Sequence, residues 1–127
     1  MASQAELTYQ AVFVNGALLS RRYIVDEFGT ALDATDVSSI TLNVYRLSQT
    51  VSGSFERTGV ENWTGIALPV AEVIQTPITS PSGKRYNFRY CVESPFTDSN
   101  TTYLVEYQIL TSTGHTIIIL IQTNTTA

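Results

Sequence analysis

The chain has 127 residues, of which 43% are hydrophobic, so it is long enough to form one domain with a substantial core. Its net charge is −4, and charged residues make up 14% of the sequence, compared with roughly a quarter in an average globular protein. The few arginines are dispersed along the sequence and form no basic stripe, which argues against nucleic-acid binding. No apolar run approaches the ~20 residues that span a bilayer, which argues against a membrane partner.

The N-terminal stretch of residues 1–6 lacks a basic region followed by an apolar one, so it is not a secretory signal peptide. We therefore expect the protein to stay in the cytoplasm in which it is made. The single cysteine, Cys91, cannot form an internal disulfide, which agrees with a reducing compartment. No second cysteine or histidine stands near it in the sequence, and we expect it to be a small buried hydrophobic residue.

Short segments with alternating apolar and polar residues follow one another along the chain, as half-buried strands require. Asn15-Gly16 is a strong turn signal after the first of them. Pro77 favours an edge strand or a strand end in its segment. A polar, glycine-punctuated stretch that contains Trp63 is predicted to be a long loop or an irregular hairpin. The strands are predicted over residues 7–14, 39–47, 85–92, 102–110 and 115–122, with less regular segments at 17–25 and 66–79 and the loop at 48–65.

Seven or eight short strands with turn signals at roughly ten-residue intervals predict an all-β fold. No stretch keeps the helical i, i+3, i+4, i+7 spacing for long, so helix content should be negligible. The prediction is a single antiparallel β-sandwich, Ig-like or jelly-roll-like with a Greek key. No internal repeat or linker divides the sequence, so residues 1–127 are predicted to form one domain, with residues 1–6 as an extended N-terminal arm.

The last predicted strand contains five consecutive large apolar residues, 117–121. Ile117, Ile119 and Ile121 can face one side of a sheet, and Ile118 and Leu120 the other. Only one sheet face is core in a small sandwich, so the second face needs an explanation. Ile118 and Leu120 are exposed, or a loop such as 48–65 covers them, or another chain covers them, or this C-terminal segment swaps into a neighbouring subunit.

The segment 96–107, Phe-Thr-Asp-Ser-Asn-Thr-Thr-Tyr-Leu-Val-Glu-Tyr, is a corner followed by a strand with a tyrosine near its start. It resembles the tyrosine corner of immunoglobulin-like and fibronectin type III domains, with Tyr103 at the corner position. The resemblance implies that the Tyr103 hydroxyl bonds to the backbone a few residues upstream. The Cys-Trp-Cys framework of antibody domains is absent, since the chain has one cysteine.

The turn at 26–29, followed by the segment 36–42, is similar to segments of small accessory virion proteins of tailed bacteriophages. Those proteins are likewise short, poor in lysine, rich in threonine, serine and tyrosine, and often Ig-like. The resemblance implies a structural virion protein, and most specifically a capsid decoration (cement) protein that stabilises the head by bridging capsomers. It would be located in the virion after assembly in the host cytoplasm. A neck, tail or fibre-associated structural protein is an alternative within the same class.

The implied partners are the major capsid protein and further copies of this chain, with neither nucleic acid nor membrane involved. The residues expected at the interface are Ile118 and Leu120 in the last strand and Ala2, Ser3 and Gln4 near the N-terminus. A carbohydrate-binding or small-ligand-binding β-sandwich is the alternative from a different functional class.

No arrangement of residues points to catalysis, and we predict neither an enzyme nor a cofactor. His115 opens the last strand without a nucleophile or an acid spaced around it, and is interpreted as a turn residue. Asp26, Glu27, Asp33 and Asp36 are hard oxygen donors that could hold calcium. They lack the spacing of an EF-hand loop, so we interpret them as turn and capping acids and predict no metal site.

Overall fold

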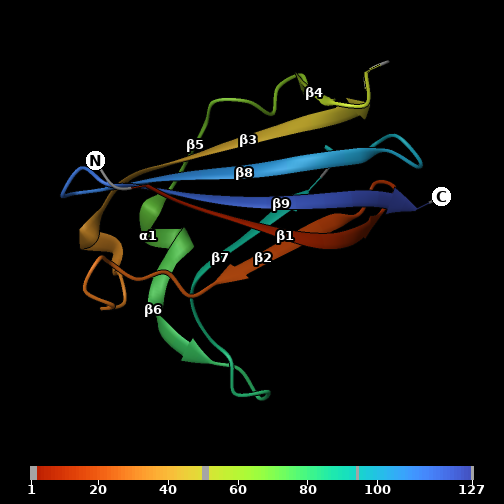
Figure 1. Ribbon diagram of the computed structural model, residues 1–127. Helices are drawn as coiled ribbons and strands as arrows, with labels where there is room; N and C mark the ends of the chain where they lie inside the picture. Colours follow the sequence, from red (N-terminus) through yellow and green to blue (C-terminus); the bar gives the residue numbers. More distant parts are fainter. Residues whose placement is uncertain (1–2, 50–51, 94, 127) are drawn as a thin grey trace.

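The computed structural model describes residues 3–49, 52–93 and 95–126, which form two β-sheets packed face to face (Figure 1). This arrangement confirms the predicted all-β sandwich. The larger sheet contains β1 (Ser3–Phe13), β9 (Thr116–Thr126), β8 (Thr102–Thr111), β3 (Val37–Gln49) and β4 (Phe55–Gly59) in that order, with β5 (Ile66–Leu68) also paired to β3. The smaller sheet contains β2 (Ala17–Arg22), β7 (Arg85–Glu93) and β6 (Ile74–Thr79) in that order.

The strand order is that of an immunoglobulin-type sandwich. Strands β2, β7 and β6 take the places of strands B, E and D, while β9, β8, β3 and β4 take those of G, F, C and C′. The pairing is not wholly antiparallel as predicted, because β1 lies parallel to β9 at the edge of the larger sheet. The turn at 14–16 sends β2 into the opposite sheet, so β1 must find its partner elsewhere.

The parallel pairing of β1 changes the prediction for the N-terminus. Ser3 lies opposite Thr116, and the register continues without interruption to Phe13 opposite Thr126. Residues 3–6 are therefore part of a strand, and the prediction of an extended arm over 1–6 is wrong for them. Residues 1–2 lie outside the described part of the chain.

Helix is confined to two short pieces within the described residues, α1 (Val70–Val73) and a 3-10 turn, η1 (Ala34–Asp36). The 3-10 turn begins at Asp33, whose Oδ1 accepts a hydrogen bond from the Thr35 N–H at 2.9 Å. The Asp36 carboxylate in turn accepts a hydrogen bond from the Asp33 N–H, which completes a capping box. Neither piece is long and apolar enough to cross a membrane.

The core lies between the two sheets and follows the predicted alternation closely. The rings of Phe88 in β7 and Tyr107 in β8 meet edge to face, with their centroids 4.9 Å apart. The Tyr107 hydroxyl also lies 3.0 Å from the Ser20 Oγ of β2, in a buried contact between the sheets. The fully buried side chains that the sheets contribute include Leu18, Ile40, Leu42, Val44, Phe88, Val92, Tyr103, Val105, Tyr107, Ile109, Ile119 and Ile121.

The described residues of the segment 48–65, which are 48–49 and 52–65, form the irregular hairpin that the sequence predicted as one of two options. Its strand β4 pairs with the end of β3, and the carbonyl oxygen of Trp63 accepts a hydrogen bond from the Val44 N–H at 2.7 Å. Trp63 packs partly against the core. Two strands, β3 and β8, separate this segment from β9, so the interpretation that it covers Ile118 and Leu120 is wrong.

Cys91 also differs from its prediction, since it is exposed on β7 opposite Leu19 of β2. The neighbouring residues Tyr90 and Val92 point into the sandwich, and strand alternation therefore turns Cys91 toward solvent.

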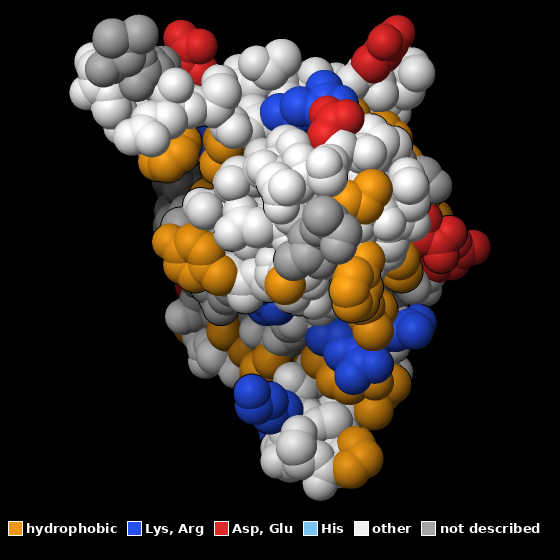
Figure 2. Space-filling view, turned by 90° about the vertical axis from the view of Figure 1, so that its right-hand side faces the viewer, with side chains coloured by type: hydrophobic (Ala, Val, Ile, Leu, Met, Phe, Trp, Pro, Cys, Tyr) orange, Lys and Arg blue, Asp and Glu red, His pale blue; other side chains and the backbone are white. Residues whose placement is uncertain are grey.

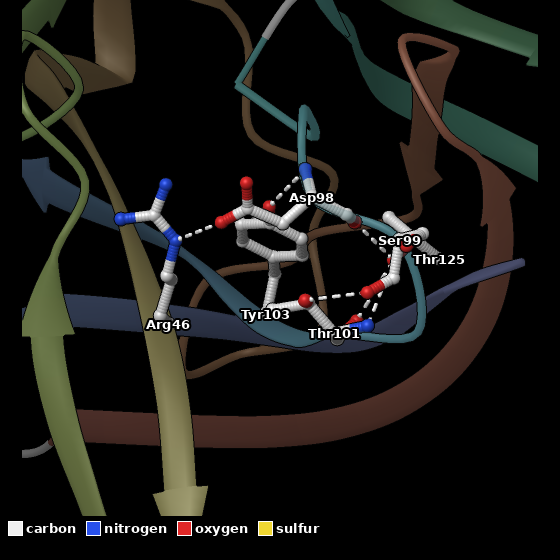
Figure 3. Close-up of polar contacts among 6 residues, drawn as sticks. All are labelled: Arg46, Asp98, Ser99, Thr101, Tyr103 and Thr125. Atoms are coloured by element: carbon white, nitrogen blue, oxygen red, sulfur yellow. Dashed lines mark hydrogen bonds and ion pairs between the residues drawn. The ribbon is translucent and has the colours of Figure 1, made fainter. Parts of the chain in front are cut away.

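Tyr103 is the second residue of β8, next to the corner that precedes this strand (Figure 3). Its side chain is fully buried, and its hydroxyl accepts a hydrogen bond from the Asp98 N–H at 3.1 Å. Thr125 of β9 closes the same corner, because its Oγ donates to the Asp98 carbonyl oxygen at 2.6 Å. The Arg46 side chain adds an ion pair to the Asp98 carboxylate at 2.9 Å. This is the geometry of a tyrosine corner.

Candidate interaction surface

The larger sheet has a solvent side, here called the outer face, on which no described strand or helix packs. The smaller sheet lies on the other side of the larger one, and Val73 of α1 belongs to the core between them. Ile118 and Leu120 point to the outer face, between β8 and β1, and are half-buried by the neighbouring strands alone. In contrast, Ile119 points inward and is 2% exposed.

The remaining residues expected at the interface lie beside β9 or outside the described region. Ser3 and Gln4 belong to β1 and pair with Thr116 and Ile117 at the start of β9. Ala2 lies outside the described residues. The structure thus brings the first residues of the described chain to the same sheet edge as the apolar strand.

Large exposed hydrophobic side chains also gather on the outer face. By strand register, Tyr9 and Phe13 of β1, Leu110 of β8 and Phe55 of β4 all point to this side. Tyr9 is 71% exposed and Phe13 is 76% exposed. Residues two and four apart in a strand share a face, so Tyr9 and Phe13 lie in one row of the predicted strand 7–14, but the sequence does not indicate that this row faces solvent. An exposed apolar surface of this kind is typical of protein interaction sites.

A buried carboxylate lies in the middle of the outer face. Glu106 of β8 is 7% exposed and pairs with Leu120 across the strands. Its Oε1 accepts hydrogen bonds from the Asn43 Nδ2 and the Gln108 Nε2, both at 3.0 Å. The Asn43 Oδ1 in turn accepts from the Gly65 N–H at 2.6 Å, which ties the network to the segment before β5.

Arg57 of β4 provides the countercharge for this carboxylate. Its Nη1 lies 3.8 Å from the Glu106 Oε2, and its guanidinium carbon lies 5.5 Å from the centroid of the Tyr45 ring. Burial raises the pKa of the Tyr45 hydroxyl, and the negative charge of Glu106 raises it further. Since Asn43, Gln108 and Arg57 all contact Glu106, a protein that binds the outer face need not supply hydrogen bonds to this carboxylate.

This network was not predictable from the sequence, because its members lie on three strands that are far apart along the chain. Each strand shows ordinary alternation, and a polar residue at an outward position predicts solvent exposure. The burial of Glu106 arises only when Asn43, Gln108 and Leu120 close around it.

A second candidate site, here called the loop-end cavity, lies between the loop after β2 and the β8–β9 turn. These two loops lie at the same end of the sandwich (Figure 1). Its volume is about 140 Å³, and Val25, Phe28, Leu32 and Ile117 supply its apolar lining. The His115 Nε2 lies 2.5 Å from the Glu27 Oε2 at this cavity and joins the two loops. His115 thus ends the β8–β9 turn, in agreement with its interpretation as a turn residue, and its ring contacts the loop after β2.

The four acidic residues considered for calcium have local partners in the structure. The Asp26 Oδ1 accepts hydrogen bonds from the Phe28 and Thr30 N–H groups, at 2.8 and 2.9 Å. Hydrogen bonds from Thr35 lower the pKa of the Asp33 carboxyl. Within the described ranges, no three histidine, cysteine or acidic side chains converge as metal ligands.

The sequence matches no protein family and none of the curated proteins with which it was compared.

Proposed function

We propose that this protein is a structural subunit that binds a neighbouring protein through the outer face of its larger sheet. In its specific form, the proposal is a capsid decoration protein that bridges capsomers of a tailed-phage head. The observation that carries the binding part is the pair Ile118 and Leu120, two large aliphatic side chains that point away from the core and are only half-buried. The phage setting rests on the sequence resemblance and on the low charge.

The energetics favour such a contact. Burying apolar surface stabilises a complex by roughly 25 cal/mol per Å² before the costs of association are subtracted. The outer face adds the exposed rings of Tyr9 and Phe13 to Ile118 and Leu120, and aromatic side chains are enriched at interfaces. Glu106 already has hydrogen-bond partners and a countercharge within the chain. A partner protein that covers Glu106 therefore does not bury an unpaired charge.

The test is incorporation of the chain into particles. We expect an antibody against the chain to label purified particles from producing cells, and we expect Ile118→Asp/Leu120→Asp to abolish incorporation because two charges would be buried in an apolar contact. The matched control is Thr76→Asp/Thr79→Asp, which adds the same two charges at exposed positions on β6 of the smaller sheet, away from the outer face. Particles that carry the Ile118→Asp/Leu120→Asp chain at the wild-type level would exclude the outer face as the interface.

A second function is favoured by the loop-end cavity, which suits a small ligand or one sugar unit packed against Phe28. Phe28 is 85% exposed beside this cavity, as an aromatic platform would be. A thermal-shift screen with monosaccharides and oligosaccharides would support this function if a sugar raised Tm in the wild type and not in Phe28→Ala. No Tm shift with any sugar would count against the carbohydrate form of this alternative.

A further inference from the structure

The cations of this chain are dispersed in the sequence but gather on the smaller sheet in the fold. Four of the seven lysine and arginine residues are exposed on β2, on β7 or in the turn that precedes β7: Arg21, Lys84, Arg85 and Arg89. We call this set the basic face. Figure 2 shows lysine and arginine side chains in the lower part of that view, at the height of the smaller sheet in Figure 1, where no acidic side chain is visible. The chain as a whole is acidic, so this face is a local reversal of charge.

Two of these arginines lie directly opposite each other. Arg21 of β2 pairs with Arg89 of β7 in the antiparallel register, and both side chains are exposed. Like charges at directly opposed positions destabilise a sheet. Among the described residues, Arg21, Lys84, Arg85 and Arg89 form no ion pair with a carboxylate. An anionic group bound between Arg21 and Arg89 would relieve their repulsion.

Tyrosine rings hold two of the guanidinium groups in place. The Arg85 guanidinium carbon lies 4.3 Å from the centroid of the Tyr23 ring, and its Nη2 donates a hydrogen bond to the Tyr23 hydroxyl. The Arg21 guanidinium carbon lies 5.2 Å from the centroid of the Tyr86 ring. Stacked guanidinium groups lose less side-chain entropy on binding than free ones. These residues line a hollow that the turn at 80–84 borders.

We infer that the basic face binds a carboxylate-rich segment of a partner protein. Arginine forms bidentate hydrogen bonds with carboxylates, and arginine and tyrosine dominate the energetic centres of protein interfaces. Nucleic acid fits less well, because Arg85 and Arg21 already stack on the rings that would otherwise receive bases. This surface lies on the opposite sheet from the outer face, and its test is independent of the function proposed above.

The probe is a fluorescent peptide of glutamate residues, with binding measured by anisotropy at low and physiological salt. We expect binding that weakens as salt rises, because the contact is electrostatic. We expect Arg21→Gln/Arg89→Gln to reduce the affinity about tenfold, and Lys84→Gln, in the exposed turn, to reduce it by a smaller factor. Arg46→Gln is the control, because it also removes one positive charge but lies beside Asp98 on the other sheet.

The comparison of single substitutions decides whether the effect is local. Arg21→Gln and Arg89→Gln should each weaken binding more than Arg46→Gln, with unchanged far-UV circular dichroism as the check of folding. Equal losses in all three would show a general charge effect and would overturn the inference. Absence of peptide binding would overturn it as well. A sulfated oligosaccharide or single-stranded DNA of matched charge that bound more tightly than the peptide would overturn the assignment of a protein partner.

Discussion

At the scale of single residues, Tyr103 links the fold to its sequence most directly. Its ring packs edge to face on Phe96 at a centroid distance of 5.2 Å, and its hydroxyl accepts from the Asp98 N–H. We expect Tyr103→Phe to keep the packing but to lower the free energy of unfolding by about 1–2 kcal/mol, since the Asp98 N–H loses its acceptor. Urea denaturation measures this change.

The control for this substitution is Tyr9→Phe, because Tyr9 is 71% exposed. It should change the free energy of unfolding by less than about 0.5 kcal/mol. Equal effects of the two substitutions would contradict a structural role for the Tyr103 hydroxyl.

Tyr107 carries a second prediction, which concerns pH. Burial raises the pKa of its hydroxyl far above the ordinary value, although the hydrogen bond with Ser20 acts in the opposite direction. The unfolded chain ionises this tyrosine near pH 10 while the folded chain keeps it neutral, so the unfolded state holds fewer protons above that pH. The contribution of Tyr107 to stability is therefore complete below pH ~10 and decreases as the pH rises above it.

We expect the stability of the wild type to fall more steeply above pH 10 than that of Tyr107→Phe, by up to about 1.4 kcal/mol per pH unit. Chemical denaturation at several pH values between about 8 and 11 measures the slope. A double variant, Tyr107→Phe/Ser20→Ala, removes the unpaired Ser20 hydroxyl and should show the same shallow slope. If the free energy of unfolding fell with pH at the same slope in the wild type and the variants, Tyr107 would ionise equally in the folded and unfolded states.

At the scale of elements, β9 explains how five consecutive apolar residues form one strand in a two-layered fold. Ile119 is 2% exposed in the core, whereas Ile118 faces the outer side and is half-buried. We expect Ile119→Ala to lower the free energy of unfolding by about 2–5 kcal/mol, because it leaves a cavity between the sheets. Ile118→Ala should cost about 1 kcal/mol, because the side chain loses only partial burial.

Thermal and urea unfolding of the two alanine variants measure this difference. Similar losses in the two variants would mean that Ile118 is as deeply packed as Ile119, and would remove the main support for an interface on the outer face.

Elements with their own regular pattern were predictable from the sequence. Alternation of apolar and polar residues predicted β3, β7 and β8 at 39–47, 85–92 and 102–110, and the corner pattern predicted the hydrogen bond of Tyr103. Pairing between distant segments was not predictable, because the alternation within a strand does not indicate which other strand lies beside it. The parallel β1–β9 edge, the closure around Glu106 and the opposition of Arg21 and Arg89 all depend on such pairings.

At the scale of the whole molecule, the two sheets present opposite chemistries to solvent. The outer face of the larger sheet offers aliphatic and aromatic side chains around an internally satisfied carboxylate. The smaller sheet offers arginines held by tyrosines. A subunit that joins two neighbours requires two separate surfaces, and two unlike surfaces select two different patches on those neighbours. A bridging role thus follows from the sandwich only if the two faces act independently.

Independence of the faces is the last prediction. Ile118→Gln/Leu120→Gln changes the outer face without changing the net charge, so it should leave the affinity for the glutamate peptide within about twofold of the wild type, because distant, unlinked sites add without coupling. The same variant should lose incorporation into particles, since two amide groups would replace the apolar contact. Arg21→Gln/Arg89→Gln should have the opposite effects: it should reduce the affinity for the glutamate peptide and affect incorporation into particles less. If either double variant lost both activities in equal measure while remaining folded, the two faces would belong to one interface, and the chain would contact a single partner.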